Sequence, residues 1–338
     1  MKKSEINPER RNFLRMLSLA GAGTVVAAAP IMFSERFSSQ LYQARQTRTL
    51  MGTYVQMTVL DKSVARAEDA VNDTFVEMAR LEEMLTRFSA TSPLAELNAS
   101  GRVSGTPAEL MQVLAAAGQI YRISQGHFDV TILPLLNAVE SQVKSGTRLD
   151  SQDLAQIQEL VGFERLAVSG NSVSLGRVGM AVTLDGIAKG YIVDQAIIYL
   201  QARGIKNALV NAGGDLRALG GKENGQGWQI LVQDPANKNA YLTRLAINDQ
   251  AVATSGNYEA YFDQAKLFGH IVNPDAPLEP AAATSATVLA STCTVADAMA
   301  TALFVMGAED GLSMIKDQAQ LGAFLVERSG QCHQLRFA

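Results

Sequence analysis

Cysteine is scarce in this sequence, and the scarcity limits the kinds of scaffold that the chain can build. Only two of its 338 residues are cysteines, Cys293 and Cys332. They could pair in an oxidising compartment, but two are too few for a disulfide scaffold, and no Cys-x-x-Cys pair is present to hold a structural metal. The chain must therefore rely on a hydrophobic core, which a chain of this length can bury.

Aromatic residues and clustered positive charge are also scarce. Aromatic residues make up 6% of the chain, and the formal net charge is −4. Without a basic stripe or interleaved aromatics, we expect no nucleic-acid partner. Two nucleotide-binding loops are missing as well. The chain has no Gly-x-x-x-x-Gly-Lys-Ser/Thr loop, and no Gly-x-Gly-x-x-Gly follows a strand after residue 29, so neither an ATP loop nor a nicotinamide-binding turn is expected.

The N-terminus has the pattern of an export signal. Residues 9–15, Glu-Arg-Arg-Asn-Phe-Leu-Arg, form a twin-arginine motif, and an apolar run follows from Met16 to Ala29. The run is too short and too rich in glycine and alanine for a membrane-spanning helix. A cleaved signal over residues 1–29 is favoured over a basic tail before a buried helix, since charge, apolar run and small residues come in the expected order. We expect a periplasmic protein that does not itself span the membrane.

The remaining sequence predicts a polar, flexible lead-in over residues 30–46 and a single domain over residues 47–338. Residues 48–60 alternate as a strand, and residues 62–88 have the apolar spacing of a long amphipathic helix. Residues 187–203 are expected to form another helix. Further expectations are a helix opened by a Thr106-Pro-Ala-Glu109 capping box, a late helix over residues 295–306, and short strands at intervals between residues 166 and 272. Helices and strands mix without strict βαβ alternation, which favours an α+β fold of mixed sheets with flanking helices.

Two segments carry most of the chemistry. Residues 183–194, Thr-Leu-Asp-Gly-Ile-Ala-Lys-Gly-Tyr-Ile-Val-Asp, indicate a strand that runs into a glycine-rich turn and opens a helix, where backbone N–H groups can face an anion. The later segment Ala296-Asp-Ala-Met-Ala-Thr301 places Asp297 and Thr301 four residues apart on one helix face. Two oxygen ligands near a phosphate-binding backbone suit a Mg²⁺-assisted pyrophosphate reaction.

Each of these candidates also has a structural interpretation. Asp297 could cap its helix, because Thr294-Val-Ala-Asp297 is itself a capping box. The segment Asn211-Ala-Gly-Gly-Asp215 could be an ordinary tight turn, and His270 could be a structural histidine on a strand. Lys189 opposes the dipole at the start of its helix, which suggests an anionic partner such as a phosphate.

Taken together, seven segments resemble the ApbE family, the FAD:protein FMN transferases, in order and spacing over residues 48–326. The export signal and the form of residues 184–190 are more similar to its NosX branch, which is linked to nitrous-oxide respiration. The seven segments are Met51-Gly-Thr-Tyr54, Phe128-Asp-Val-Thr131, Gly186-Ile-Ala-Lys-Gly-Tyr191, Asn211-Ala-Gly-Gly-Asp215, Thr254-Ser-Gly256, His270-Ile-Val-Asn-Pro274 and Asp297-Ala-Met-Ala-Thr301.

The resemblance implies an enzyme that cleaves the pyrophosphate of FAD, releases AMP and attaches FMN to a threonine hydroxyl of a target flavoprotein. It implies two interwoven lobes with the flavin site between them, and a target that is a membrane-anchored, NosR-like respiratory flavoprotein. Mg²⁺ would be held by Asp297, Thr301 and the backbone carbonyl of Gly186. Catalytic roles map to His270, Lys189 and Asp297, and flavin and adenine contacts map to Met51, Phe88, His127, Phe128, Asp129, Thr183, Asp185, Lys189 and Ile271.

One position departs from the family pattern. The family commonly has aspartate where this chain has Thr183, and here the carboxylate comes two residues later, at Asp185. On an extended chain the two side chains would point to the same side, so Asp185 could take over the flavin contact, or it could cap the helix that follows. Two other functions stay open: hydrolysis of FAD to FMN and AMP, and non-catalytic flavin binding.

Overall fold

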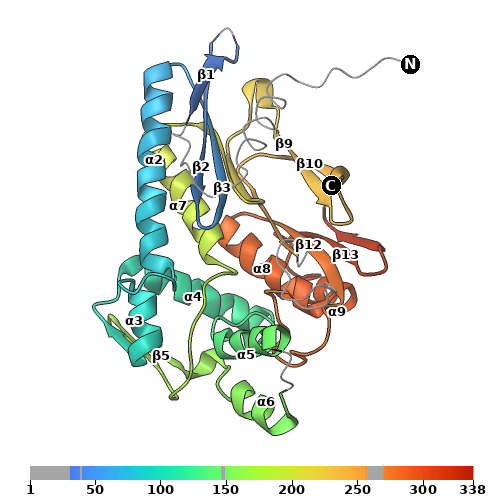
Figure 1. Cartoon of the computed structure of the whole chain (residues 1–338). Helices are drawn as coiled ribbons and strands as arrows, with labels where there is room; N and C mark the ends of the chain where they lie inside the picture. Colours follow the sequence, from blue (N-terminus) through green and yellow to red (C-terminus); the bar gives the residue numbers. More distant parts are fainter. Residues whose placement is uncertain (1–30, 39, 146–148, 257–268, 338) are drawn as a thin grey trace. The chain divides into compact units, whose positions relative to one another are not determined.

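A nine-stranded sheet in which every pairing is antiparallel organises the fold (Figure 1). Its strand order is β1-β2-β3-β7-β8-β11-β12-β13-β14. The strands are β1 (Met32–Arg36), β2 (Tyr42–Leu50), β3 (Thr53–Asp61), β7 (Asn207–Ala212), β8 (Asp215–Leu219), β11 (Ala251–Gly256), β12 (Ala283–Ala290), β13 (Gly322–Glu327) and β14 (Cys332–Leu335).

This computed structural model describes residues 31–38, 40–145, 149–256 and 269–337. The chain divides into two compact units, Met1–Ile31 and Met32–Ala338, and all described helices and strands belong to the second. The expected export signal lies outside the described residues. No helix in the described part is both long enough and apolar enough to cross a membrane.

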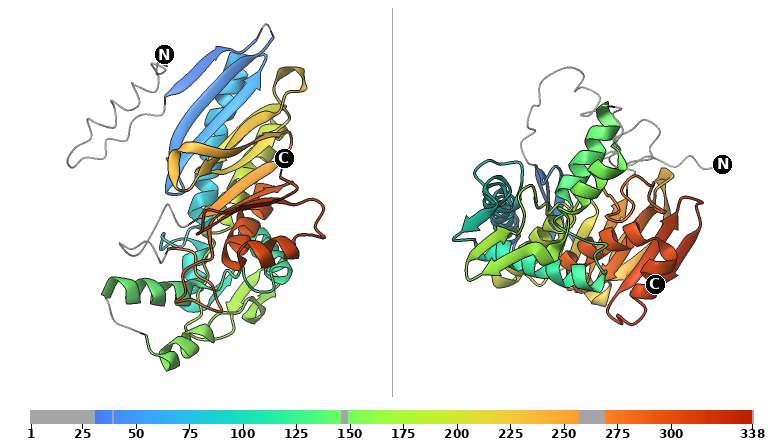
Figure 2. Two further views of the ribbon diagram at one scale, coloured as in Figure 1. Left: turned by 90° about the vertical axis from the view of Figure 1, so that its right-hand side faces the viewer. Right: turned by 90° about the horizontal axis from the view of Figure 1, so that it is seen from below.

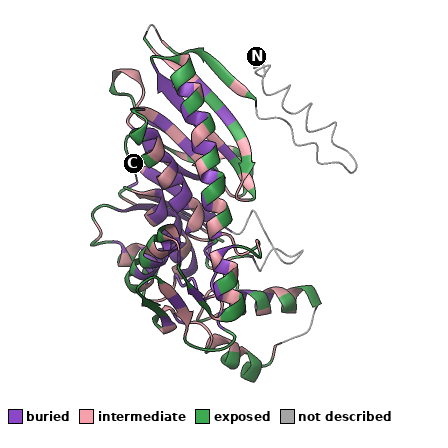
Figure 3. Cartoon of the chain, turned by 90° about the vertical axis from the view of Figure 1, so that its left-hand side faces the viewer, coloured by how far each residue is buried: buried purple, intermediate pink, exposed green. Residues whose placement is uncertain are grey.

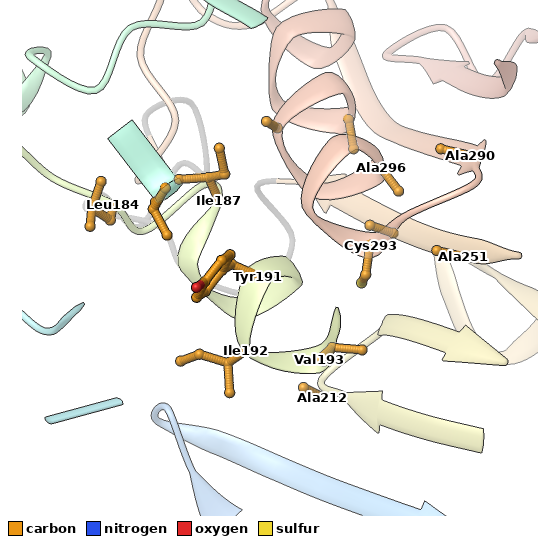
Figure 4. Close-up of a cluster of buried hydrophobic side chains, with 14 of the residues drawn as sticks. Leu184, Ile187, Tyr191, Ile192, Val193, Ala212, Ala251, Ala290, Cys293 and Ala296 are labelled. Carbon is orange, nitrogen blue, oxygen red and sulfur yellow. The ribbon is translucent and has the colours of Figure 1, made fainter. Parts of the chain in front are cut away.

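Three helices cover one face of the sheet: α2 (Val64–Leu85), α7 (Ala188–Ala202) and α8 (Cys293–Met306). Apolar residues of α2 recur every three or four positions, and this stripe is buried while the opposite side is exposed (Figure 3). Between α7, α8 and the strands lies a core of small and aliphatic side chains that includes Ala251, Ala290 and Ala296 (Figure 4). The two helices are thus packed closely against each other and against the sheet.

The other face of the sheet is covered by a hairpin of β9 (Trp228–Asp234) and β10 (Asn237–Ile247) (Figure 2). Side chains alternate between the two faces along a strand. On β13, for example, Ala323 and Leu325 belong to the helix-side core, whereas Phe324 and Val326 pack in the cluster around Trp228. The central strands of the sheet are therefore buried on both faces, whereas β1 at one edge is mostly exposed.

The middle of the chain forms a smaller helical region with its own three-stranded sheet, in the order β4-β6-β5. Its elements are α3 (Pro93–Ser100), β4 (Arg102–Ser104), α4 (Ala108–Ile123), α5 (Leu133–Ser145), α6 (Ser151–Gln158), a 3₁₀ turn (Phe163–Arg165), β5 (Leu166–Ser169) and β6 (Ser172–Leu175). A second 3₁₀ turn (Glu223–Gly225) follows β8, and α9 (Ala308–Met314) follows α8. The α+β prediction is confirmed.

Several local predictions are wrong. The expected flexible lead-in contains β1 and the first part of β2, and the single strand expected over residues 48–60 is a hairpin that turns at Met51 and Gly52. The proposed capping box before α4 does not form, because the helix has no side-chain cap and the Thr106 hydroxyl has no partner. Cys293 is buried, Cys332 is exposed, and both are free, so they form no disulfide.

Candidate functional site

A cavity of about 710 Å³ lies against the helix-bearing face of the sheet. Its walls include every site residue nominated from the sequence, although those residues come from distant parts of the chain. They are Met51, Phe88, His127, Phe128, Asp129, Thr183, Asp185, Gly186, Lys189, His270, Ile271, Asp297 and Thr301. The structure thus places the candidate residues around one space, and their individual roles stay predictions.

Oxygen atoms from α8 and from strand β11 gather beside the turn at Gly186, at one wall of the cavity. Thr301 on α8 shares a 3.0 Å hydrogen bond with Ser255 on β11, and a Cβ atom at Gly186 would lie only 3.1 Å from the Thr301 hydroxyl. Asp297 is buried one turn earlier on α8. The N-cap of the helix is Thr292 and not Thr294, so the interpretation of Asp297 as part of a capping box from Thr294 is wrong.

The glycine-rich turn before α7 contacts protein acceptors. The N–H groups of Ile187 and Ala188 both donate to the Leu184 carbonyl, and the Gly190 N–H donates to Oδ2 of Asp297 at 3.0 Å. These amides therefore do not face the cavity as the expected anion-binding turn. Because the Gly190 amide bonds to Asp297, it does not close a helical turn on the Gly186 carbonyl.

Lys189 lies between two buried carboxylates. Its ammonium group is 2.5 Å from Oδ2 of Asp215 and 3.9 Å from Oδ1 of Asp297. Burial disfavours the charged lysine, but attraction by the two carboxylates outweighs it and raises the pKa of Lys189. Burial and repulsion by Asp215 raise the pKa of Asp297 well above its usual value, against the attraction of Lys189.

Asp215 lines the cavity but was not nominated from the sequence. The segment before it does form a tight turn, as its structural interpretation proposed: Gly213 and Gly214 have φ angles of 61° and 105°, and the Asn211 side chain accepts from the Gly214 N–H. This turn starts β8 at Asp215, which faces Lys189. Asp215 could have been found from the sequence, because it directly follows a glycine turn and lies on the same side of its strand as Arg217.

Asp185 stands at the cavity wall but does not cap α7. The N-cap residue of α7 is Ile187, which makes no side-chain cap, so the capping interpretation is wrong. Instead, Oδ2 of Asp185 accepts from both Nε and Nη2 of Arg87 at 3.1 Å. The guanidinium of Arg87 also lies 4.1 Å from the ring centroid of Phe88, which is 76% exposed. Thr183 is buried, and its hydroxyl accepts from the Asp185 N–H.

The segment that contains His127, Phe128 and Asp129 is held mainly by internal bonds. The Asp129 carboxylate accepts from the backbone and hydroxyl of Thr131 and from the Phe163 N–H. Burial raises the pKa of Asp129 despite these bonds. The bonds of the Asp129 side chain thus stabilise this part of the cavity wall. Phe128 is buried beside Gly186.

The remaining candidates complete the cavity wall. Met51 has a left-handed backbone with φ 54°, unusual for a residue other than glycine, and its N–H donates to the Glu82 carboxylate at 2.7 Å. His270 is exposed, whereas Ile271 is half-buried and packs against the core. Neither lies on a strand, contrary to the expected strand over residues 268–272, of which residue 268 lies outside the described part.

The oxygen atoms at this wall match the ligands that Mg²⁺ prefers: a carboxylate, a hydroxyl and a backbone carbonyl. The missing side chain at Gly186 leaves its backbone close to Thr301. In the described ranges, no group of three or more His, Cys, Asp or Glu side chains is arranged to hold a metal. A divalent ion here would therefore depend on Thr301 and Gly186 as well as on Asp297.

Known proteins resemble this chain over most of its length. A model of the ApbE family matches residues 51–325. The chain is 28% identical over 307 residues to an FAD:protein FMN transferase of Vibrio cholerae, covering 86% of this chain and 89% of the relative. A second FAD:protein FMN transferase, from Klebsiella pneumoniae, is 30% identical over 283 residues, covering 80% of this chain and 86% of the relative.

Solved structures agree with this relationship. The flavin transferase ApbE from Vibrio cholerae superposes with a TM-score of 0.72 at 26% identity, covering 87% of this chain and 97% of its own. The ApbE protein from Thermotoga maritima gives a TM-score of 0.77 at 26% identity, covering 88% and 97%. The family model alone spans well over half of the sequence. The chain belongs to the ApbE family.

Proposed function

We propose that this enzyme transfers FMN from FAD to a threonine hydroxyl of a target protein, releases AMP and depends on Mg²⁺. One observation carries the proposal: a single cavity joins the oxygen atoms of Asp297, Thr301 and Gly186 to the cation of Lys189 and to the exposed ring of Phe88. The FAD:protein FMN transferases of similar sequence support the transfer of FMN from FAD to a protein.

In this reaction the threonine oxygen bonds to the phosphorus that carries riboflavin, and the bond from that phosphorus to the oxygen of AMP breaks. AMP leaves with the electron pair of the broken bond. Mg²⁺ held by Asp297, Thr301 and Gly186 would neutralise the pyrophosphate and the charge that develops on the departing phosphate. Lys189 adds a fixed positive charge beside the same oxygens.

The acceptor hydroxyl must lose its proton during the attack, because its ordinary pKa is far above neutral. His270 and Asp297 are the two candidate bases at the cavity wall. Phe88 presents an aromatic face on which a flavin or adenine ring can stack. Met51, in the turn between β2 and β3, also lines the cavity, and we assign it to the surface that binds the flavin.

The proposal includes a setting for the reaction. The twin-arginine pattern over residues 9–15 supports removal of residues 1–29 and work in the periplasm. The target is proposed to be a membrane-anchored respiratory flavoprotein with an acceptor threonine, as the NosX-like features of the sequence suggest. Replacing Arg10 and Arg11 by lysine should leave an unprocessed precursor inside the cell, and normal processing would contradict this route.

The test mixes the purified protein with FAD and Mg²⁺, with and without a target protein that carries the acceptor threonine. The proposal predicts AMP release that depends on both the target and Mg²⁺, with one FMN mass added to the target for each AMP. AMP release without any target would instead indicate a hydrolase. FAD binding without AMP release in either case would indicate a flavin-binding accessory protein.

A further inference from the structure

Asp194 ends the motif that opens α7, yet it does not line the cavity. Its carboxylate is buried and joins three elements. Oδ1 accepts from the Cys293 N–H at 2.8 Å and pairs with Nη1 of Arg217 at 2.7 Å. Oδ2 accepts from both the N–H and the hydroxyl of Thr294, at 2.8 and 2.5 Å. These side-chain bonds of Asp194 connect α7 to β8 and to the start of α8.

These bonds fall on the line where α7 and α8 touch. Gly190 and Asp194 lie four residues apart on α7, and Cys293 and Asp297 lie four residues apart on α8. A Cβ atom at Gly190 would collide with the Cys293 carbonyl oxygen and lie 2.8 Å from Cβ of Asp297. The backbones of α7 and α8 are therefore in contact at Gly190. One turn further along α7, the Asp194 carboxylate holds the first residues of α8.

We propose that Asp194 is a positioning residue for the metal site: it holds the first turn of α8 against α7 so that Asp297 and Thr301 stand at fixed distances from Gly186 and Lys189. The inference rests on the proposed function, since it assigns Asp194 a part in binding the divalent ion. A carboxylate that accepts amides at a helix N-terminus is favoured by the helix dipole. Without it, the amides of residues 293 and 294 and the Arg217 guanidinium would lose their shared partner, and α8 could shift.

A second buried aspartate provides a matched control. Asp61 accepts from the Ser63 N–H at 2.8 Å, pairs with Arg66 at 2.5 Å and lies beside the start of α2. Like Asp194, it accepts from an arginine and from a backbone amide at the start of a helix, although here the arginine lies on that same helix. It does not line the cavity, whereas Glu82 and Leu85, at the other end of α2, do. Loss of Asp61 should therefore lower stability without disturbing the metal site.

The experiment uses Mn²⁺ as the probe, counted as free ion by electron paramagnetic resonance during titration of the protein without FAD. FAD binding without metal is measured separately by fluorescence, and thermal unfolding gives Tm. Asp194→Asn should weaken Mn²⁺ binding by roughly tenfold or more, as is usual for loss of a partner that orients metal ligands. FAD binding without metal should change by less than about twofold, because no cavity residue is removed.

Thr294→Val provides a milder variant in case Asp194→Asn does not fold. It removes only the hydroxyl bond to Asp194 and should weaken Mn²⁺ binding in the same direction, and Thr294→Ser should restore it. Asp61→Asn should lower Tm and leave Mn²⁺ binding unchanged. Lowered Tm with unchanged Mn²⁺ binding in the Asp194 and Thr294 variants would overturn the inference, as would a wild-type protein that binds no Mn²⁺. A wild-type protein that binds Mn²⁺ but transfers no FMN would instead overturn the proposed function.

Discussion

The two faces of the nine-stranded sheet bury very different side chains. The helix-bearing face holds the buried Asp194, Asp215 and Asp297, with Lys189 and Arg217 half-buried beside them. On the other face, the cluster under the β9–β10 hairpin is built from apolar side chains such as Trp228, Phe324 and Val326. A buried charge is costly unless it is paired, so charges persist where partners compensate them. The comparison teaches that both faces stabilise the fold by apolar packing, while the helix-bearing face also holds paired charges around the candidate site.

The largest effect is expected for a change on the helix-bearing face, measured as the rate of FMN transfer. Asp297→Asn should lower the rate of FMN transfer by about a thousandfold, the loss expected when several kcal/mol of metal assistance disappears. The global fold should survive, because the change removes a buried negative charge that Asp215 repels. The rate of AMP release measures the loss of activity, and circular dichroism checks that the fold is intact. Unchanged transfer in this variant would falsify the metal assignment.

The second effect tests the compensation of charge on the helix-side face. Lys189→Met leaves Asp215 and Asp297 buried without their cation and should lower the free energy of unfolding by about 3–5 kcal/mol. Adding Asp215→Leu to this variant should recover much of that loss, since one of the unpaired charges is then gone. Urea denaturation of the single and double variants gives the comparison. A single variant as stable as wild type would show that the buried acids do not need Lys189.

The third effect probes the apolar face. Trp228 is 4% exposed in the cluster under β9–β10, so Trp228→Leu should lower the free energy of unfolding by about 2 kcal/mol through lost contacts and a partial cavity. The FMN transfer rate per folded molecule should stay at the wild-type value. Denaturation and steady-state kinetics are measured on the same preparation. A large change in rate without a change in stability would break the division between the faces.

The smallest effect concerns the cavity wall near Arg87. The pair of Arg87 with Asp185 is half-exposed, and Asp185→Asn should lower the free energy of unfolding by less than about 1 kcal/mol. If Asp185 serves the flavin contact that the family places at residue 183, FAD affinity should fall a few-fold, and Thr183→Asp should raise the affinity of that variant again. A titration of FAD fluorescence decides the matter. Asp185→Asn with unchanged affinity and turnover would leave Asp185 only its pairing with Arg87.

Long periodic segments were predictable from the sequence because their signal is local. The helix α2 shows its apolar stripe plainly, and α7 follows the expected range closely. Strand β12 gave no such signal, because it is a central strand buried on both faces and built of small residues. The β2–β3 turn was hidden too, since Met51 adopts a backbone conformation that its residue type does not announce.

The candidate site was predictable as a set of residues but not as a network. Motifs show which residue types gather, whereas bonds between distant segments depend on packing. Asp194 and Thr294 lie a hundred residues apart in sequence, and Lys189 faces Asp215 only because a glycine turn starts β8 there. The expected anion-binding turn at α7 is instead bonded within the protein for the same reason: Asp297 arrives from α8 and takes the Gly190 amide.

The most direct test of the central claim is a crystal structure of the protein with FAD and Mn²⁺, in which anomalous scattering locates the ion. The account predicts a single anomalous peak within bonding distance of Asp297, Thr301 and the Gly186 carbonyl, with the FAD pyrophosphate on its open side. An ion bound elsewhere in the cavity, or FAD bound with Asp297 and Thr301 contacting no metal, would contradict it.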